Sequence, residues 1–422
     1  MRILIMIALV AVSFLQADAT IKITKKIKKN PTIVVANASE SSVDAVINRK
    51  FLKLLIGDLK VSSNFKVRDD YINASFDGSD LLSELLRDKT ELLVKSKLES
   101  DASGKLHARV KLINAQNGLL VYEKSYMISK KNRYPFLAHN VAIDINKYFG
   151  GSPIDWMNKY IVFAKYTSAG KSSIIVSDYT LSFKKTLVSG GLNIFPKWAN
   201  QKQDSIYYTS YNHGKPTLFL LNLYSGQKTK IASSSGMMVC SDVSDDGSKL
   251  LLTMAPHDQP DIYLYDVNTG SKKRITKYRG IDVSGSFVDN DTGVVFISER
   301  LGYPNIFHKN IAGGKVEQMV YHGKNNSSCT TSGNYIVYSS REAQNAFGKS
   351  VFNLYLISTQ TDFIRKLTSN GKNMFPRFAS DGETVLFIKD TGRSSALGVL
   401  RLNANRSFLF PLPAGKIQSI DW

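Results

Sequence analysis

The side chains that could do chemistry are few in this sequence, and they form no recognised catalytic pattern. The six histidines show neither the H-E-x-x-H nor the H-x-H spacing that places two imidazoles on one zinc ion. The sequence has no G-x-S-x-G, the turn that exposes a nucleophilic serine in hydrolases. The nearest phosphate-loop match, from Ala343 to Ser350, lacks the first glycine and lies between two expected strands. The sequence therefore predicts no catalytic residue and no cofactor.

One short stretch has the residue types of a metal site. His257, Asp258 and Asp261 lie within a few positions of one another. A metal ion needs ligands in a fixed geometry, and three ligands from one flexible turn lack it. A solvated loop is the favoured interpretation, so no metal ligand is predicted.

The two cysteines, Cys240 and Cys329, are too few for a disulfide framework. Each lies in an alternating apolar and polar stretch that we expect on the inner strands of non-adjacent repeats. Buried free thiols are favoured over a bridge between them.

The charge of the chain is strongly positive. Lysine and arginine number 55 against 35 acidic residues, which gives a net charge of +20. Only the segment from Lys22 to Lys29 concentrates this charge, and the rest is spread along the chain. Nucleic-acid-binding domains gather basic residues on one face or arm, so a solvated basic surface is favoured over a nucleic-acid partner.

The first nineteen residues have the pattern of a secretory leader. Met1-Arg2 is a short basic start, Ile3 to Leu15 is apolar, and Ala17-Asp18-Ala19 is a cleavage signal before Thr20. The apolar run is too short for a membrane span. We therefore expect cleavage between Ala19 and Thr20 and an exported, soluble mature chain with no membrane span.

Residues 20–150 mix helical and strand periodicity. Pro31 to Ala36 predicts a strand, and Ser41 or Ser42 is a possible N-cap for a helix that follows up to Leu59. Further elements are expected as a short helix, three strands and a closing helix at residues 81–86, 91–98, 106–113, 119–128 and 137–149. The order predicts a small α+β domain that ends at Gly150-Gly151.

After Gly151 the pattern changes to strands only and repeats. Punctuating glycines recur every 43 to 48 residues, a spacing typical of propeller blades. Each period holds the same four strands, and the blades are expected at about residues 192–234, 238–278, 282–322, 326–370 and 374–413. The first copy, from Lys159 to Ser189, lacks an inner strand.

The end of the chain fits that gap. Ile417 to Trp422 matches the segments that open two other blades, Asn193 to Trp198 and Asn373 to Phe378. The fold class predicted is an α+β N-terminal domain at 20–150 followed by an all-β six-bladed propeller at 151–422. Its C-terminal strand closes the ring and removes exposed edges.

This organisation resembles the TolB family, the exported component of the Tol-Pal envelope system. Its W-S-P-D-G repeats are similar to Val243 to Leu250, followed by Tyr263 to Gly270, and to Phe378 to Gly382. In the first domain the similar segments are Gly57 to Lys60, Asn64-Phe65, and Gly118 with Tyr122. The resemblance covers essentially the whole chain. The motif tryptophan remains only at Trp198 and Trp422, with Val243 and Phe287 in its place elsewhere.

The resemblance implies a monomeric, non-catalytic scaffold in the periplasm. Such a protein links the outer-membrane lipoprotein Pal to the inner-membrane protein TolA and supports envelope integrity and constriction at cell division. An exported propeller enzyme or a carbohydrate-binding lectin is the alternative.

The resemblance also implies two contact surfaces. TolA would contact the lysine-rich segment from Thr20 to Asn30, through Thr20, Ile21, Lys22, Ile23, Lys25, Lys26 and Ile27. Pal would bind the propeller mouth where the inner strands begin, called here the inner-strand rim: Asn193, Phe195, Met237, Met238, Ile281, Asp282, Asn325, Asn326, Asn373, Met374, Ile417 and Gln418. Charge reversal at Asp282 or a bulky residue at Asn373 is expected to weaken Pal binding without unfolding.

Overall fold

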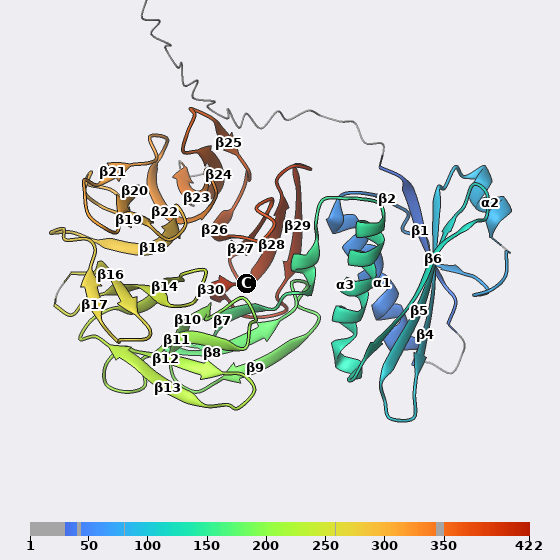
Figure 1. Ribbon diagram of the computed structural model, residues 1–422, viewed down its shortest axis with the longest axis horizontal. Helices are drawn as coiled ribbons and strands as arrows, with labels where there is room; N and C mark the ends of the chain where they lie inside the picture. Colours follow the sequence, from blue (N-terminus) through green and yellow to red (C-terminus); the bar gives the residue numbers. More distant parts are fainter. Residues whose placement is uncertain (1–29, 40–43, 80, 258, 343–349) are drawn as a thin grey trace, which may run out of the picture. The chain divides into compact units, whose positions relative to one another are not determined.

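A computed structural model describes residues 30–39, 44–79, 81–257, 259–342 and 350–422. The leader with its cleavage site, and the segment from Thr20 to Lys29, lie outside the described residues. Residues 31–422 form one compact unit that holds an α+β sheet domain and a β-propeller (Figure 1). No helix in the described part of the chain has the length and apolar character needed to cross a membrane.

The N-terminal domain is built on a mixed sheet with the strand order β2-β1-β4-β5-β6, with β3 also paired to β1. The central strands β1 and β4 are parallel, and the hairpins β4-β5 and β5-β6 are antiparallel. The strands are β1 (Thr32–Asn37), β2 (Lys66–Val67), β3 (Ile72–Asn73), β4 (Leu92–Ser100), β5 (Leu106–Asn114) and β6 (Leu120–Ile128). The sequence predicts all of them except β2 and β3, which are two residues long and have no detectable periodicity.

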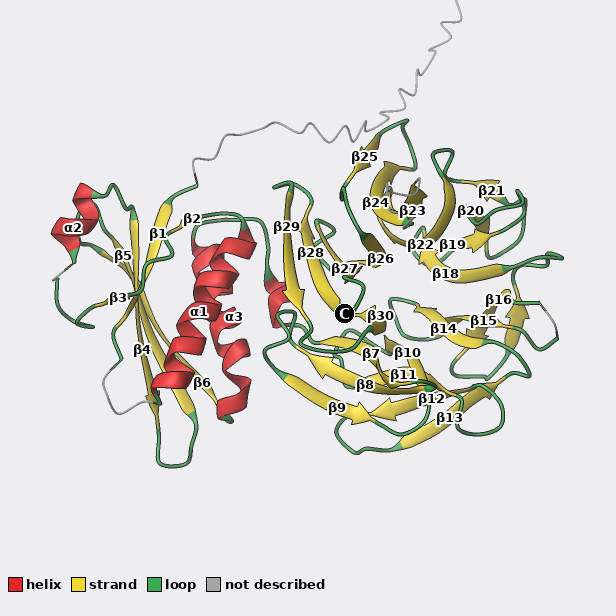
Figure 2. Ribbon diagram, turned by 180° about the vertical axis from the view of Figure 1, so that it is seen from behind, coloured by secondary structure: helices red, strands yellow, loops and turns green. Residues whose placement is uncertain are grey.

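Two helices cover one face of this sheet (Figure 2). These are α1 (Ala45–Ser62) and α3 (Tyr134–Tyr148), and their apolar stripes bury residues such as Phe51, Leu55 and Val141 against the strands. The side chain of Asp44 caps α1 by accepting hydrogen bonds from Val46 N at 2.9 Å and Ile47 N at 3.4 Å. The expected cap at Ser41 or Ser42 is therefore wrong. The short α2 (Leu82–Arg87) packs over a smaller cluster on the other face.

Six four-stranded blades follow, and in Figure 1 they succeed one another around a ring as the colours run from green to red. After η1 (Lys131–Arg133) and η2 (Asp155–Asn158), the strands are β7 (Ile161–Ser168), β8 (Lys171–Ser177), β9 (Lys184–Val188), β10 (Asn193–Trp198), β11 (Ser205–Ser210), β12 (Thr217–Asn222), β13 (Lys228–Ser233), β14 (Met238–Val243), β15 (Lys249–Met254), β16 (Asp261–Asp266), β17 (Lys272–Arg274), β18 (Asp282–Val288), β19 (Gly293–Ser298), β20 (Asn305–Asn310), β21 (Glu317–Gln318), β22 (Lys324–Ser332), β23 (Tyr335–Glu342), β24 (Val351–Ser358), β25 (Ile364–Lys366), β26 (Lys372–Phe378), β27 (Thr384–Asp390), β28 (Ser395–Arg401), β29 (Arg406–Pro411) and β30 (Ile417–Asp421). The predicted propeller fold is confirmed.

The last strand closes the ring, as predicted. β30 pairs antiparallel with β7, so the C-terminal strand is the inner strand of the blade that β7, β8 and β9 begin. Ile417 and Ile420 are buried in a cluster that also holds Phe163 from the same blade and Leu397 from the preceding one. The six inner strands β30, β10, β14, β18, β22 and β26 contact one another in succession around the channel.

All six inner strands carry a bulge or register shift. The register shifts between Ile194 and Lys197 in β10 and between Met374 and Arg377 in β26, and similar shifts occur in β14, β18, β22 and β30. The residue at the bulge turns its N–H toward a neighbouring inner strand. Phe195 N donates to Ser419 Oγ at 3.2 Å, and Phe375 N donates to Ser328 Oγ at 3.1 Å. The bulges therefore connect blades to one another across the channel wall.

A buried polar cluster joins the helices of the N-terminal domain to the first blade. His139 on α3 contacts Asp58 on α1 through Nδ1 at 2.7 Å, and its Nε2 lies 3.4 Å from Asp178 of the propeller. Tyr179 donates its hydroxyl hydrogen to Asp58. All four side chains are buried. Burial alone would lower the pKa of His139, but Asp58 and Asp178 outweigh it and raise the pKa from 6.5 to about 9.

This cluster predicts a loss of stability at alkaline pH. Because the pKa of His139 is about 9 in the folded state against 6.5 when unperturbed, its stabilising effect is complete below pH 6.5 and is lost as the pH rises through 9. The loss should be on the order of 3 kcal/mol in the free energy of unfolding. Urea unfolding between pH 6.5 and 9.5 measures it. His139→Gln should remove this pH dependence, whereas His213→Gln, at an exposed histidine of the propeller, should keep it. An equal slope in His139→Gln would contradict the assignment.

Candidate functional site

The channel is lined at one level by one residue of each inner strand, the fifth when each strand is counted from its buried rim residue. Counting from Asn193, Met238, Asp282, Asn326, Asn373 and Ile417, these residues form what we call the channel ring: Lys197, Asp242, Ser286, Thr330, Arg377 and Asp421. The ring combines two cations, two carboxylates and two hydroxyls, so its formal charge is zero. Each of the six blades contributes one residue to the ring. The ring residues are therefore far apart in the sequence, and no local motif contains them.

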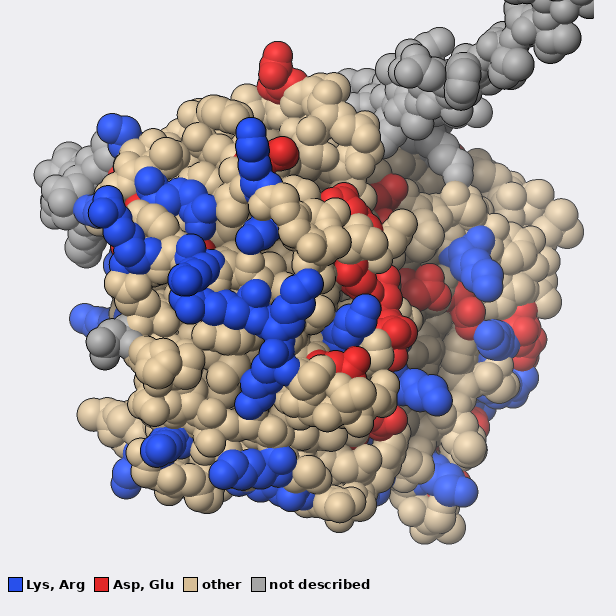
Figure 3. Space-filling model, turned by 60° about the vertical axis from the view of Figure 1, so that its left-hand side comes forward, with Lys and Arg blue, Asp and Glu red and all other residues tan. Residues whose placement is uncertain are grey.

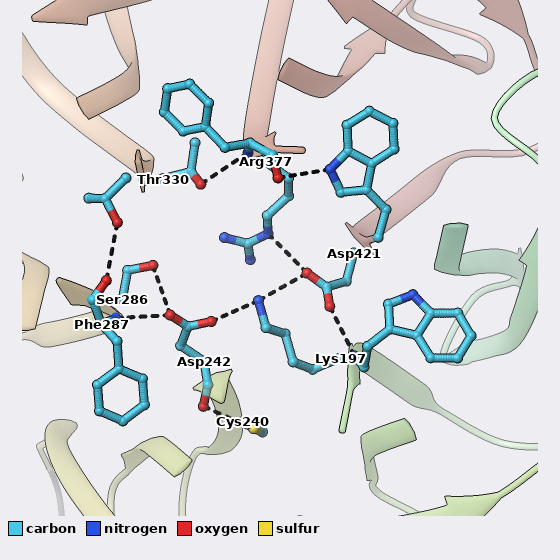
Figure 4. Close-up of polar contacts among 12 residues, drawn as sticks. Lys197, Cys240, Asp242, Ser286, Phe287, Thr330, Arg377 and Asp421 are labelled. Atoms are coloured by element: carbon cyan, nitrogen blue, oxygen red, sulfur yellow. Dashed lines mark hydrogen bonds and ion pairs between the residues drawn. The ribbon is translucent and has the colours of Figure 1, made fainter. Parts of the chain in front are cut away.

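Lys197 bridges the two carboxylates of the ring (Figure 4). Its Nζ lies 2.9 Å from Asp242 Oδ1 and 2.9 Å from Asp421 Oδ1. The second oxygen of each carboxylate accepts a backbone hydrogen bond at 2.9 Å, from Phe287 N for Asp242 and from Trp198 N for Asp421. The ring thus ties four blades together through charge-assisted hydrogen bonds.

The electrostatics of Lys197 follow from this bridge. Burial by itself would lower the pKa of the amine, because a buried cation loses its hydration. The charges of Asp242 and Asp421 outweigh that effect and raise the pKa of Lys197 above its ordinary value. The amine therefore stays protonated inside the channel. A protonated lysine held between two acids cannot serve as a general base.

Beyond the ring, toward the ends of the inner strands, the channel widens into a cavity of about 920 Å³. Aromatic side chains that follow the ring residues form part of its wall: Trp198, Phe287, Phe378 and Trp422, with Trp156 beside them. The charged residues of its wall are Lys159, Lys197, Arg377, Asp242, Asp245, Asp289, Asp291 and Asp421. Acids outnumber bases, and Asp245, Asp289 and Asp291 form what we call the acidic mouth. Figure 3 shows acidic side chains gathered along a hollow, beside a surface rich in lysine and arginine.

The inner-strand rim lies at the opposite end of the same strands, and the structure divides its members by exposure. Six of them are buried: Asn193, Met238, Asp282, Asn326, Asn373 and Ile417. Phe195, Asn325, Met374 and Gln418 are half-buried. Met237 and Ile281 each expose 38% of their surface.

The buried polar members of the rim hold strands together. Asn193 Nδ2 donates to Gly190 O at 2.7 Å, and Asn373 Nδ2 donates to Phe352 O at 3.0 Å. Asp282 accepts two hydrogen bonds from Arg300 at 3.0 and 2.9 Å. Charge reversal at Asp282 or a bulky residue at Asn373 would therefore disrupt packing, contrary to the expectation that such changes spare the fold.

The remaining candidate residues have structural surroundings. Cys240 and Cys329 are free and buried on β14 and β22, and burial raises the pKa of both thiols, that of Cys329 to about 12. Asp261 pairs with Arg274 and accepts a hydrogen bond from Thr276 at 3.1 Å, while Asp258 lies outside the described residues. Within the described residues, no three His, Cys, Asp or Glu side chains are grouped to hold a metal ion. The whole TolA-contact set from Thr20 to Ile27 lies outside them too.

Sequence reasoning missed the channel ring because its six positions differ in residue type. The signal that could have found it is the position within the repeat. Aligning the inner strands on Asn193, Met238, Asn373 and Ile417 puts Lys197, Asp242, Arg377 and Asp421 in one column, where each charge is followed by an apolar residue. Four charges in one inner column of a propeller predict mutual pairing across the channel.

The fold and the site together define a class of protein. It is a closed six-bladed propeller that follows an α+β domain in the chain, and the charged residues of the propeller channel pair with one another. Residues 157–422 match the family model described as the TolB beta propeller domain. Over its full length the chain is 50% identical to the Tol-Pal system protein TolB of Wolinella succinogenes, covering 100% of both chains. It is 41% identical to that of Helicobacter hepaticus, covering 99% of both.

A solved structure has the same fold. TolB from Acinetobacter baumannii superposes with a TM-score of 0.76 at 20% identity, covering 93% of this chain and 96% of that one. The chain belongs to the TolB family, and the resemblance seen in its sequence is confirmed. It is a non-catalytic propeller component of the Tol-Pal envelope system.

Proposed function

We propose that this protein is a periplasmic scaffold that links Pal to TolA, with Pal on the inner-strand rim and TolA on the segment from Thr20 to Asn30. Such a link supports outer-membrane integrity and constriction at cell division. The observation that carries the proposal is the full-length similarity to relatives named Tol-Pal system protein TolB, 50% identical in one case. Export through a leader at residues 1–19 fits a component of an envelope system.

The exposed members of the rim supply the chemistry of a protein contact. Met237 and Ile281 come just before inner strands of adjacent blades, and each leaves 38% of its surface exposed. Phe195 and Met374 are half-buried near the same end of the channel. Methionine and aromatic side chains adapt well to a partner surface and are enriched in interfaces. The rim is therefore better suited to a protein partner than to a sugar.

A charge on the exposed part of the rim should weaken Pal binding. We expect Met237→Asp and Ile281→Asp each to raise the Kd for purified Pal at least tenfold, because each would bury an unpaired carboxylate in the interface. Titration calorimetry measures the Kd, and melting curves should stay within a few degrees of the native protein. Leu409→Asp is the matched control, since Leu409 is 47% exposed on the outer strand β29. Native affinity in both rim variants would refute the rim assignment.

Removal of the N-terminal segment should separate the two partners. A mature chain that starts at Pro31 is expected to keep native affinity for Pal and to lose TolA binding. The segment alternates isoleucine with lysine, so it can add as a strand to a partner's sheet edge while the lysines steer it. Replacing only its lysines by glutamine should give a milder loss, one that shrinks further at high salt. Equal capture of TolA by the truncated and complete chains would exclude the segment as the contact.

A further inference from the structure

The guanidinium of Arg377 has donors that the protein does not use. Its Nε lies 3.4 Å from Ile420 O and 3.8 Å from Asp421 Oδ1. The two terminal nitrogens have no hydrogen-bond partner among the described residues, and Figure 4 shows one of them turned toward the side of the ring where Ser286 and Thr330 lie and the other toward the centre of the ring. The side chain is 24% exposed, toward the cavity that it lines. A planar fork of free donors in a confined space matches a carboxylate.

A neighbouring donor points to the same kind of ligand. Thr330 Oγ1 accepts a hydrogen bond from Phe378 N at 3.3 Å, which leaves its own proton free to donate. Trp156 and Trp198 also line the cavity with their rings, but their indole N–H groups are buried away from its open space and offer no donor to a ligand. The accessible donors beside the cavity are therefore the Thr330 hydroxyl and the Arg377 guanidinium, and both suit a carboxylate.

The carboxylates of the acidic mouth favour a positively charged group. Asp245 N donates to Asp291 Oδ2 at 3.0 Å, which holds these two acidic residues side by side. Burial raises the pKa of Asp291, and the charges of Asp245 and Asp242 add to the rise. A cation at the mouth would relieve this repulsion. The aromatic walls between the mouth and the ring favour a cationic or apolar body as well.

We propose that this cavity binds a short peptide-like ligand that ends in a free carboxylate and carries an amine. The carboxylate lies deep, against Arg377 and Thr330, and the ammonium group lies at the acidic mouth. Asp245 follows the ring residue Asp242 by three positions, in the turn after β14, so the acidic mouth lies outward from the level of Arg377. A tripeptide carries a carboxylate at one end and an ammonium group at the other.

The site differs from the proposed Pal contact. The rim lies where the inner strands begin, and this cavity lies where they end, with the bridge of Lys197, Asp242 and Asp421 between them. Ligand binding in this cavity can therefore be tested independently of Pal and TolA binding. It adds a small-molecule site to a protein whose family is a protein-binding scaffold.

Tryptophan fluorescence tests the proposal directly, because all three tryptophans of the chain line this cavity. We use the whole purified protein with trialanine as the probe. Trialanine should change the emission saturably, with a Kd of about 1 mM or lower for a ligand of this size. Trialanine amide should bind at least tenfold more weakly, and N-acetyl-trialanine at least fivefold more weakly.

Variants assign each end of the ligand. Arg377→Gln should lose at least tenfold in affinity for trialanine and should no longer distinguish the acid from the amide. The double variant Asp245→Asn/Asp291→Asn, outside the ring, should keep that distinction and lose the preference for a free amine. Arg406→Gln, at an exposed arginine on β29, should bind as the native protein does. Melting curves check folding, and Arg377→Lys, which keeps the charge but not the fork, replaces Arg377→Gln if that variant unfolds.

Two results would overturn the proposal. One is the absence of a saturable change with trialanine up to 50 mM, about fifty times the expected Kd. The other is equal binding of trialanine and its amide by the native protein. Loss of Pal binding in a rim variant with trialanine binding unchanged would show that the two sites are separate.

Discussion

A chain that ends at Gly415 should lose the cooperative melting transition of its propeller. The deletion removes β30, so β7 becomes an exposed edge and the ring opens. Ile417 and Ile420 leave the core, and burial of one such side chain is worth about 2 kcal/mol. Lys197 also loses Asp421, one of its two partners. We expect the free energy of unfolding to fall by at least about 5 kcal/mol.

Calorimetry and near-UV circular dichroism measure this loss, since both report the packing of the blades. A synthetic peptide of residues 416–422 should restore part of the transition when added in excess, because it would supply the missing inner strand. The matched control is Gln418→Ala, which trims a half-buried side chain but keeps the strand and should melt close to the native protein. An unchanged transition in the truncated chain would mean that the C-terminal strand is not needed for closure.

The blades could be predicted because propeller repeats carry local signals. Each second strand is a short apolar run, as in Leu250 to Met254 and Val294 to Ser298, and a glycine marks each period. The unpaired segment from Ile417 to Trp422 then identified the closing strand, since a ring leaves one inner strand unassigned. The strands β2 and β3 were not predicted because each is only two residues long, which is too short to show an alternating pattern. They are strands only because they pair with β1.

The exposure of the rim could not be predicted from residue type. Asn193 and Asn373 lie at the start of inner strands, where polar residues often face solvent, yet both side chains turn inward to backbone carbonyls. Met237 and Ile281 stay exposed one position earlier, before the strands begin. A difference of one residue reverses the direction of a side chain in a strand. A rim predicted from spacing alone therefore includes both buried and exposed side chains.

Contacts between distant segments are the second limit. His139 meets Asp58 and Asp178, but those residues lie on two helices and a propeller loop with no shared motif. Each alone has an ordinary interpretation as a surface or helix residue. Only the packing of the helices against the first blade makes them a buried cluster, and this packing leaves no periodic signal.

Replacement of Lys197 should be the most damaging single substitution in the channel. Lys197→Met removes the amine that lies 2.9 Å from both Asp242 and Asp421, and it leaves two carboxylates facing each other in the channel wall. Removing one partner of a buried ion pair costs about 3–5 kcal/mol, because the remaining charge stays desolvated. Urea unfolding measures the change. Lys249→Met, at an exposed lysine on β15, should change the free energy of unfolding by less than about 0.5 kcal/mol.

A triple variant distinguishes unpaired charge from lost packing. When Asp242→Asn and Asp421→Asn are added to Lys197→Met, no charge of the bridge remains. Each asparagine oxygen can still accept the backbone hydrogen bond from Phe287 N or Trp198 N. We expect the triple variant to regain at least half of the stability that Lys197→Met loses, since a buried ion pair replaced as a whole is often nearly neutral. If the triple variant is instead as unstable as Lys197→Met, the lysine acts through the packing of its aliphatic chain, and the bridge contributes little to holding the blades together.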